Sequence, residues 1–270
     1  MRGILKFIVA LLIAAVSLVT YWCSSETNEF TGEEQRVDMT VEQEIALGLQ
    51  AAPQMAEQYG GLHPDQEAAR EVKAIGQKLV QNTRARDTPY QFDFHLLADE
   101  QTVNAFALPG GQIFITAGLL RRLESEGQLA GVLSHEIGHV VARHSAQQLA
   151  KAKLTQGLTG AAAIAMYDPD NPASRSGAAV AAMIGQVVNM SYGREDELES
   201  DALAVQLTGA AGYDPRAMKR VMEILEEASG GASGGPEFMQ THPNPGNRMA
   251  RIEEAIQQEY PQGVPEGLIQ

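Results

Sequence analysis

The sequence predicts an α+β fold that is mainly helical and contains one small β-sheet. Apolar residues recur at helical spacing along most of the chain, whereas residues 91–97 and 112–116 show the two-residue period of strands. A chain of 270 residues can bury one substantial core, which favours one main domain with short appendages. We divide the chain into an N-terminal segment (1–25), a linker (26–39), the main domain (40–260) and a C-terminal tail (261–270).

The charge balance argues against one large class of partner. Lys and Arg total 20 against 34 Asp and Glu, which gives a net charge of −14, and no dense basic cluster is present. Nucleic-acid binding requires such a cluster to neutralise phosphates, so we expect no nucleic-acid partner. The single cysteine, Cys23, also excludes an internal disulfide.

The first 22 residues have the composition of an export signal or a membrane anchor. Arg2 and Lys6 form a positive start, and the stretch from Phe7 to Trp22 carries no charge. Its length lies between the apolar core of a signal peptide and a span of about 20 residues, so cleavage and retention both remain open. Either outcome sends the rest of the chain out of the cytoplasm, into the cell envelope.

Cys23 adds a third possibility, because bacterial lipoproteins carry a lipidated cysteine at this point. Ser24 and Ser25 resemble the small polar tether of such proteins. However, Trp22 and Thr20 stand where a small residue and an aliphatic residue are usual. We therefore expect the membrane as a partner, through the N-terminal segment or through a lipidated Cys23.

Two helices are expected before the sheet. Thr40 and Gln43 form a capping box at the start of the first helix, and Gly60 with Gly61 ends it. The second helix runs from about Pro64 to Gln81 with a buried apolar stripe. The sheet follows, with Phe92, Phe94 and Leu96 on one side of its first strand; the strand of residues 112–116 repeats the alternation.

Residues 153–190 are rich in Ala, Gly and Met and are interrupted by turn residues at 168–172. They predict two small-residue helices. Each is short for a membrane span and carries Gln or Asn, which favours close packing inside the domain over a membrane hairpin.

The segment from Ser125 to Ala150 predicts one buried helix that carries a polar group. Ser125 and Gln128 form a capping box, and apolar residues follow at helical spacing. Into this pattern the sequence places His135, Glu136 and His139. Burying these polar groups without partners would cost several kcal/mol, roughly, so a partner is required.

A single metal ion meets that requirement. Because residues four apart lie on one helix face, His135 and His139 can bind one tetrahedral zinc ion at about 2.0–2.1 Å. Glu136 lies beside the pair and can act as base on a zinc-bound water, whose pKa falls to about 7. The His-Glu-x-x-His spacing is that of a zinc protease helix, with Glu136 as the catalytic residue.

A catalytic zinc site also needs a third protein ligand and one open position. The acidic run of residues 195–201 enters a helix with a buried side, and Glu197 and Asp201 share one face of it. One can bind zinc while the other accepts the free ring N–H of a ligand histidine. Spacing alone leaves Glu195, Glu199 and Asp201 as rival ligands, and an ordinary solvated helix start as the alternative.

The combined pattern resembles the HtpX/BepA/LoiP group of zinc metallopeptidases, which is related to the CAAX prenyl proteases. There the helix reads His-Glu-hydrophobic-Gly-His, as residues 135–139 do, and a later Glu-x-x-x-Asp supplies the third ligand. The resemblance implies a zincin-type (gluzincin) domain with one Zn²⁺ per chain, held by His135, His139 and Glu197, with Asp201 in support. Further matching segments are Asn104–Ala107 with Pro109–Gly111, Arg194, Gly212–Pro215, and Thr241–Pro243 with Arg248.

Two more histidines bear on the site. His242 follows a glycine-rich loop in a Thr-His-Pro turn, and relatives place a histidine of this motif near the metal. It could be an extra ligand that blocks the water position, or it could stabilise the oxyanion; the resemblance gives Arg248 a supporting place nearby. His144 lies off the ligand face of a continuous helix, so we expect it to support the site from outside or to lie on the surface.

The substrate is expected to be an extended peptide. The strand of residues 112–116 and the segment 104–107 are predicted to form a sheet edge to which such a peptide adds as a further strand, with Asn104, Ala105, Phe106 and Gly110 as the contacts. Because backbone pairing tolerates many side chains, we expect weak selectivity.

The predicted function is zinc-dependent hydrolysis of peptide bonds. The resemblance implies that the substrates are misfolded or unassembled envelope proteins on the periplasmic side. A membrane-tethered, chaperone-like binding protein, whose zinc site is structural or latent, is the alternative. A helical protein with a chance motif is a third interpretation.

Overall fold

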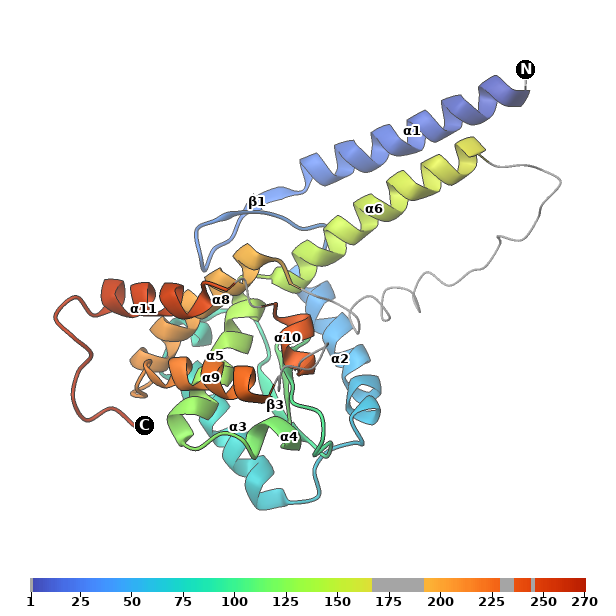
Figure 1. The fold of residues 1–270 in the computed structure, drawn as a ribbon. Coiled ribbons are helices and arrows are strands. Elements are labelled where there is room, and N and C mark those ends of the chain that lie inside the picture. Colours follow the sequence, from blue (N-terminus) through green and yellow to red (C-terminus); the bar gives the residue numbers. More distant parts are fainter. Residues whose placement is uncertain (1, 167–191, 229–235, 244–245) are drawn as a thin grey trace. The chain divides into compact units, whose positions relative to one another are not determined.

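The computed structural model describes residues 2–166, 192–228, 236–243 and 246–270 (Figure 1). The predicted class is confirmed, because helices dominate and the strands are short and few. The elements are α1 (Arg2–Cys23), β1 (Ser25–Thr27), β2 (Glu34–Arg36), α2 (Val41–Gln58), α3 (Gln66–Gln81), the 3₁₀ helix η1 (Arg84–Asp87), β3 (Asp93–Leu97), β4 (Ala105–Ala107), β5 (Gln112–Thr116), α4 (Ala117–Leu120), α5 (Glu126–Val141), α6 (His144–Met166), α8 (Arg194–Ala210), α9 (Ala217–Ala228), α10 (Glu237–Thr241) and α11 (Arg248–Glu259).

The chain forms two compact units. Unit 1 comprises Met1–Met39 and Ser145–Asn189, and unit 2 comprises Thr40–His144 and Met190–Gln270. The first predicted small-residue helix, within α6, therefore groups with the N-terminal segment rather than with the main domain. The second, in residues 167–191, lies outside the described residues.

Close packing explains why α6 groups with α1. The two helices run side by side within unit 1 (Figure 1), and a Cβ atom added to Gly157 would lie 2.1 Å from the Ser17 Oγ. A glycine at this point lets the two backbones approach, which is the use expected of a small-residue helix.

The predicted linker contains a hairpin instead of irregular chain. Strands β1 and β2 pair antiparallel, and Gly32 occupies the turn with φ of +78°. Side chains support the pairing, because the Thr27 hydroxyl donates to Glu34 at 2.5 Å and the Asn28 amide donates to Gln35 at 3.1 Å. These polar contacts give a short strand pair without an apolar pattern, which is why the sequence does not indicate it.

The helices before the sheet begin where the capping residues predict. In α2 the Thr40 hydroxyl accepts from the Gln43 backbone, and the Gln43 side chain accepts in return from the Thr40 backbone. Helix α3 begins at Gln66, two residues later than expected, because the Asp65 side chain caps it by accepting from the backbone N–H groups of Glu67 and Ala68.

The sheet of unit 2 has the strand order β3-β5-β4, with β3 parallel and β4 antiparallel to β5. Strand β3 alternates as predicted, with Phe94 and Leu96 buried. Strand β5 does not alternate, because it is central and buried on both faces. The prediction that residues 112–116 form a sheet edge is therefore wrong, and β4 is the edge strand on that side.

Helix α5 is the centre of unit 2. Every residue from Gly127 to Val141 is buried, and α5 packs against α8, α9, α3 and the sheet. The Ser125 hydroxyl caps it, while the Gln128 side chain accepts from the Glu124 backbone rather than from Ser125.

The predicted single helix of residues 125–150 is wrong, because the chain breaks at its middle. Helix α5 ends at Val141, and Arg143 adopts a left-handed conformation with φ of +57° before α6 begins at His144. Glu44 of α2 holds the buried Arg143 guanidinium through contacts of 2.8 Å to Nε and 2.5 Å to Nη2. No glycine or proline marks this break in the sequence.

The predicted C-terminal tail returns to unit 2. Ile269 accepts from the Asp214 backbone at 2.8 Å and donates to Gly212 at 3.0 Å, so the last residues pair with the start of the turn before α9. Gln270 extends the contact by donating its side-chain amide to Asp214 at 2.6 Å.

Candidate metal centre

Four buried side chains converge in unit 2. His135 and His139 come from α5, Glu197 from α8 and His242 from the residue after α10, and one donor atom of each lies within 4.8 Å of all the others. All four are almost without exposed surface. The structure thus brings together the three predicted ligands, and it adds His242 to them.

The distances between donor atoms fit one tetrahedral ion. At a zinc–nitrogen distance of about 2.0–2.1 Å, neighbouring corners of a tetrahedron are about 3.3–3.4 Å apart. The Nε2 atoms of His135 and His139 are 3.0 Å apart, and His139 Nε2 lies 3.4 Å from Glu197 Oε1. The other Glu197 oxygen lies 3.5 Å from His135 Nε2. Two imidazoles and a carboxylate are the donor set of a catalytic zinc site, so these residues fit zinc.

His242 lies beside the other three residues, with a ring nitrogen within reach of the same ion. Its Nδ1 lies 3.4 Å from His135 Nε2 and 3.1 Å from Glu197 Oε1. Phe238 of α10 stacks on the imidazole with ring centroids 4.3 Å apart. Helix α10 is itself fixed, because the Phe238 backbone donates to Val103 just before strand β4.

The carboxylate of Glu136 stands beside the cluster without a hydrogen-bonding partner among the described residues. It is fully buried, and its Oε1 lies 3.7 Å from His242 Nε2. Burial raises the pKa of Glu136, and the nearby histidines oppose that effect only in part.

Asp201 lies behind His135, on the side away from the cluster. Its Oδ1 is 3.0 Å from His135 Nδ1, where it can accept the ring N–H. Arg248 of α11 holds Asp201 with two charge-assisted bonds of 2.7 Å and lies 3.0 Å from Glu197 Oε2. Burial alone would raise the pKa of Asp201, but Arg248 outweighs burial and lowers it.

Burial and the neighbouring carboxylates also shift the pKa values of the two histidines of α5. Burial alone would lower the pKa of His135, but Asp201 and Glu197 outweigh it and raise that pKa to about 9. For His139 burial dominates, and its pKa falls well below the ordinary value. A neutral imidazole is the form that binds a metal, so the environment of His139 favours its ligand form.

The crossing of α5 and α8 brings Glu197 to the histidines. A Cβ atom added to Gly138 would lie 3.2 Å from both Cα and O of Ser200, so the helices touch at these two small residues. The rival acids go elsewhere: Glu195 is exposed, Glu199 contacts His144 and Asp201 contacts His135.

The predicted substrate residues contact different elements of unit 2. Asn104 donates its amide to Glu237 of α10 at 3.0 Å and to Tyr59 at 3.4 Å. Ala105 and Phe106 form β4, where Phe106 stacks between Phe114 and Tyr59. Gly110 contacts α2, because an added Cβ would lie 2.4 Å from Ile45 Cα. Their contact with a substrate stays a prediction.

Three neighbours of the cluster were not predicted as part of the site. Tyr192 stacks on His139 at 3.9 Å between ring centroids, Phe238 stacks on His242, and Glu237 bonds to Asn104. Each lies far from the His-Glu-x-x-His helix in sequence, so no local pattern could have indicated them. His144 was expected to support the site or to lie on the surface, and it is buried against His139.

Sequence comparisons agree with this geometry. Residues 66–256 match peptidase family M48. The chain is 30% identical over 277 aligned positions to the beta-barrel assembly-enhancing protease of Escherichia coli, covering 97% of this chain and 55% of that protein. It is 32% identical to the protein of the same name from Yersinia pestis, covering 78% of this chain and 43% of that protein.

A eukaryotic relative shows the breadth of the similarity. The mitochondrial metalloendopeptidase OMA1 of Schizosaccharomyces pombe is 32% identical, covering 61% of this chain and 46% of that protein. The chain thus spans about half the length of the curated relatives it matches. Because the family match contains every member of the buried cluster, we conclude that this chain belongs to peptidase family M48, whose members use zinc.

Proposed function

We propose that this protein is a zinc-dependent endopeptidase that hydrolyses peptide bonds in misfolded or unassembled proteins of the cell envelope. The observation that carries the proposal is the buried Glu136 carboxylate, which has no hydrogen-bonding partner among the described residues, beside a donor set that can hold one metal ion. A purely structural zinc site would leave this carboxylate buried without a use, at a cost of several kcal/mol in rough terms.

The residues of the site have distinct roles in this proposal. His135, His139 and Glu197 would hold the ion, which would supply Lewis acidity to water and to a carbonyl group. Glu136 accepts a proton from the attacking water and returns it to the leaving amine nitrogen. Its raised pKa makes the carboxylate a stronger base, which suits a group that takes up a proton and then releases it. Asp201 and Arg248 keep His135 oriented.

Strand β4 is the proposed docking edge for the substrate. It pairs with β5 on one side, and among the described residues no strand pairs with its other side. An extended peptide that adds there would bind mainly through backbone hydrogen bonds, next to Asn104, Ala105 and Phe106. This mode tolerates many side chains, which suits unfolded substrates.

The test is hydrolysis of casein by the full-length chain in detergent, together with metal analysis. We expect about one zinc per chain, as one site requires, and cleavage that disappears in Glu136→Gln while zinc stays bound. Zinc binding without cleavage in the native protein would overturn the proposal in favour of the chaperone-like alternative. Absence of zinc would leave only the chance-motif interpretation.

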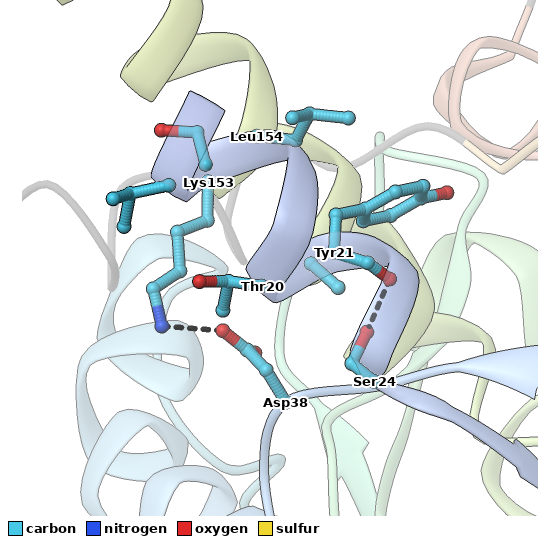
Figure 2. A pocket seen from close by; sticks show the side chains of 9 residues that line it. Thr20, Tyr21, Ser24, Asp38, Lys153 and Leu154 are labelled. Carbon is cyan, nitrogen blue, oxygen red and sulfur yellow. Dashed lines mark hydrogen bonds and ion pairs between the residues drawn. The ribbon is translucent and has the colours of Figure 1, made fainter. Parts of the chain in front are cut away.

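We further propose that α1 is retained as a membrane anchor. Residues Ile4–Cys23 are long and apolar enough to cross a membrane, as a signal sequence also is. However, α1 has partners in its own unit: Ser17, Thr20 and Tyr21 line a pocket with Lys153 and Leu154 of α6 (Figure 2). Cleavage of α1 would leave that surface of α6 uncovered.

Two further contacts support retention. Figure 2 shows Lys153 paired with Asp38 beside Thr20, and Ser24 bonded to the Tyr21 carbonyl. The Arg36 guanidinium lies 4.6 Å from the Trp22 ring and 5.4 Å from the Tyr21 ring, so the end of α1 is tied to the hairpin that follows. A positive start at Arg2 and Lys6 favours a cytoplasmic N-terminus and an extracytoplasmic remainder.

Intact mass of protein extracted from membranes tests this anchor. We expect the mass of the uncleaved chain and resistance to carbonate extraction. A mass that begins at Cys23 with a lipid attached, or one that begins further along without lipid, would show that α1 is removed and would overturn the anchor. Neither result would affect the test of proteolysis.

A further inference from the structure

A second histidine lies directly behind the ligand His139. The Nδ1 atoms of His139 and His144 are 2.9 Å apart, and the other ring nitrogen of His144, Nε2, lies 3.1 Å from Glu199 Oε2. His144 is fully buried, whereas the Glu199 side chain is 31% exposed. The arrangement runs from the cluster through a buried imidazole to a carboxylate at the surface.

Only one placement of protons satisfies these contacts when His139 binds a metal through Nε2. The proton of the neutral His139 ring must then sit on Nδ1, so His144 Nδ1 must accept it. The proton of His144 sits on Nε2, where Glu199 accepts it. The Ser200 hydroxyl, 3.4 Å from His144 Nδ1, is a second donor facing the same acceptor.

The opposite placement would prevent metal binding. If His144 carried its proton on Nδ1, it would donate to His139 Nδ1, and the His139 proton would move to the nitrogen that faces the cluster. The contact of 3.1 Å between Glu199 Oε2 and His144 Nε2 opposes this state, because a carboxylate oxygen accepts a hydrogen bond and is satisfied by an N–H at Nε2. We propose that His144 and Glu199 are positioning residues that hold His139 in the tautomer and orientation that bind zinc.

The break between α5 and α6 places His144 for this role. In a continuous helix His144 would be rotated about 140° from His139. The left-handed conformation of Arg143 instead turns the chain so that His144 lies under His139, and the buried contact of Arg143 with Glu44 holds the turn. A non-glycine residue rarely adopts this conformation, and such outliers concentrate at functional sites.

The two ligand histidines therefore have different supports. His135 faces the carboxylate of Asp201 directly, whereas His139 reaches Glu199 through a second imidazole. This inference rests on the proposed function only in taking His139 as a zinc ligand; it adds the residues that orient it.

The experiment measures zinc affinity of the full-length chain in detergent by competition with a fluorescent chelator. We expect His144→Leu, which removes the acceptor, to weaken binding about 10- to 100-fold. His144→Asn should retain most of the affinity, because its amide oxygen can stand where Nδ1 stands. Glu199→Ala should weaken binding, whereas the control Glu195→Ala, an exposed acid on the same helix, should not.

A second measurement separates positioning from misfolding. In ¹⁵N-histidine-labelled, zinc-loaded protein, the His139 Nδ1–H signal should be protected from exchange and should lose that protection in His144→Leu. The double variant His144→Leu/Glu199→Ala should bind zinc no more weakly than His144→Leu alone, because the two residues act in series.

The outcomes distinguish this inference from the proposed function. If the native protein binds no zinc, the proposed function fails. If the native protein binds zinc but His144→Leu has the same zinc affinity as His144→Asn, the positioning role alone is overturned. The same holds if Glu199→Ala has the same zinc affinity as Glu195→Ala.

Discussion

The ionisable groups around the four-residue cluster (His135, His139, Glu197 and His242) are nearly all buried, and burial of a charge is costly unless a partner compensates it. Asp201 and Glu197 have Arg248 as that partner. Glu136 has no hydrogen-bonding partner among the described residues, and the histidines crowd one another at 3.0–3.4 Å. A bound cation would resolve this arrangement, because it would lie between the imidazole nitrogens and add positive charge beside Glu136.

The position of His242 leads to the first prediction. Its Nδ1 lies 3.4 Å from His135 Nε2 and 3.1 Å from Glu197 Oε1, so it would compete with an attacking water for the open position of a bound ion. We therefore expect His242→Ala to raise casein hydrolysis, on the order of several-fold. The measurement is the initial rate at saturating zinc. His63→Ala, at a half-buried histidine outside the cluster, is the control and should leave the rate unchanged.

A fall in rate would have a definite meaning. If His242→Ala reduced hydrolysis to the level of Glu136→Gln, then His242 would not cap the site. It would instead take part in the chemistry, as a group that stabilises the oxyanion.

At the scale of elements, the site depends on how α8 meets α5. Helix α5 presents His135 and His139 whatever its neighbours do, but Glu197 reaches them only because Gly138 and Ser200 let the two helices touch. Any larger side chain at position 138 meets the Ser200 backbone, which cannot move aside as a flexible side chain could.

Gly138→Leu should therefore damage both stability and metal binding. We expect a loss of about 1–3 kcal/mol in the free energy of unfolding, as for other overpacked contacts, and a weaker zinc affinity because Glu197 moves away. Chemical denaturation followed by circular dichroism, with chelator competition, measures both. Gly160→Leu, where an added Cβ meets nothing within 4 Å, is the control. Unchanged zinc affinity in Gly138→Leu would contradict the crossing as the determinant.

The docked C-terminal segment gives a prediction with a pH dependence. Burial alone would raise the pKa of Asp214, but bonds from Arg216, with Gln270, outweigh it and hold the pKa below its ordinary value near 3.8. A lowered pKa in the folded state stabilises the fold above the unfolded pKa, and this contribution is lost as pH falls through the folded pKa.

Asp214→Asn should therefore cost about 1 kcal/mol of unfolding free energy at neutral pH. The difference from the native protein should shrink as pH falls below about 4. Urea denaturation across this range measures it. Asp87→Asn, an exposed acid in an exposed ion pair, should have no measurable effect at any pH. A difference that stayed constant with pH would show that Asp214 acts through shape rather than charge.

At the scale of the whole molecule, the buried cluster joins segments that are distant in the chain. It takes residues from α5, from α8 and from the turn after α10, so one ion would fasten three parts of unit 2 together. Ligand binding to the folded state alone adds stability in proportion to the logarithm of ligand concentration over Kd.

Zinc removal should consequently destabilise unit 2. We expect a chelator to shift its thermal unfolding to lower temperature. If the free zinc concentration before chelation is a thousand times Kd, the lost stabilisation is about 4 kcal/mol of unfolding free energy. Differential scanning calorimetry measures the shift. Glu197→Gln should show little further change on chelation, whereas Glu226→Gln, an exposed acid of α9, should respond like the native protein. A chelator shift of equal size in Glu197→Gln would exclude Glu197 as a ligand.

Local features were predictable because they depend on residues within one turn of each other. The capping of α2 by Thr40 and the shared face of His135 and His139 follow from spacing along a single helix. The alternation of β3 also follows from its own residues. The hairpin in the linker and the break at Arg143 did not, since polar side-chain contacts and a distant Glu44 stabilise them.

The amino-acid order by itself determined the helical character of the chain, its small sheet and the paired histidines beside Glu136. Spacing left rival acids open and the resemblance pointed to Glu197; the tertiary structure brings Glu197 to those histidines, adds His242 to them and sets His144 behind His139. The physical reason is that a helix sets the direction of its own side chains, whereas the distance between two helices depends on what each buries at their crossing.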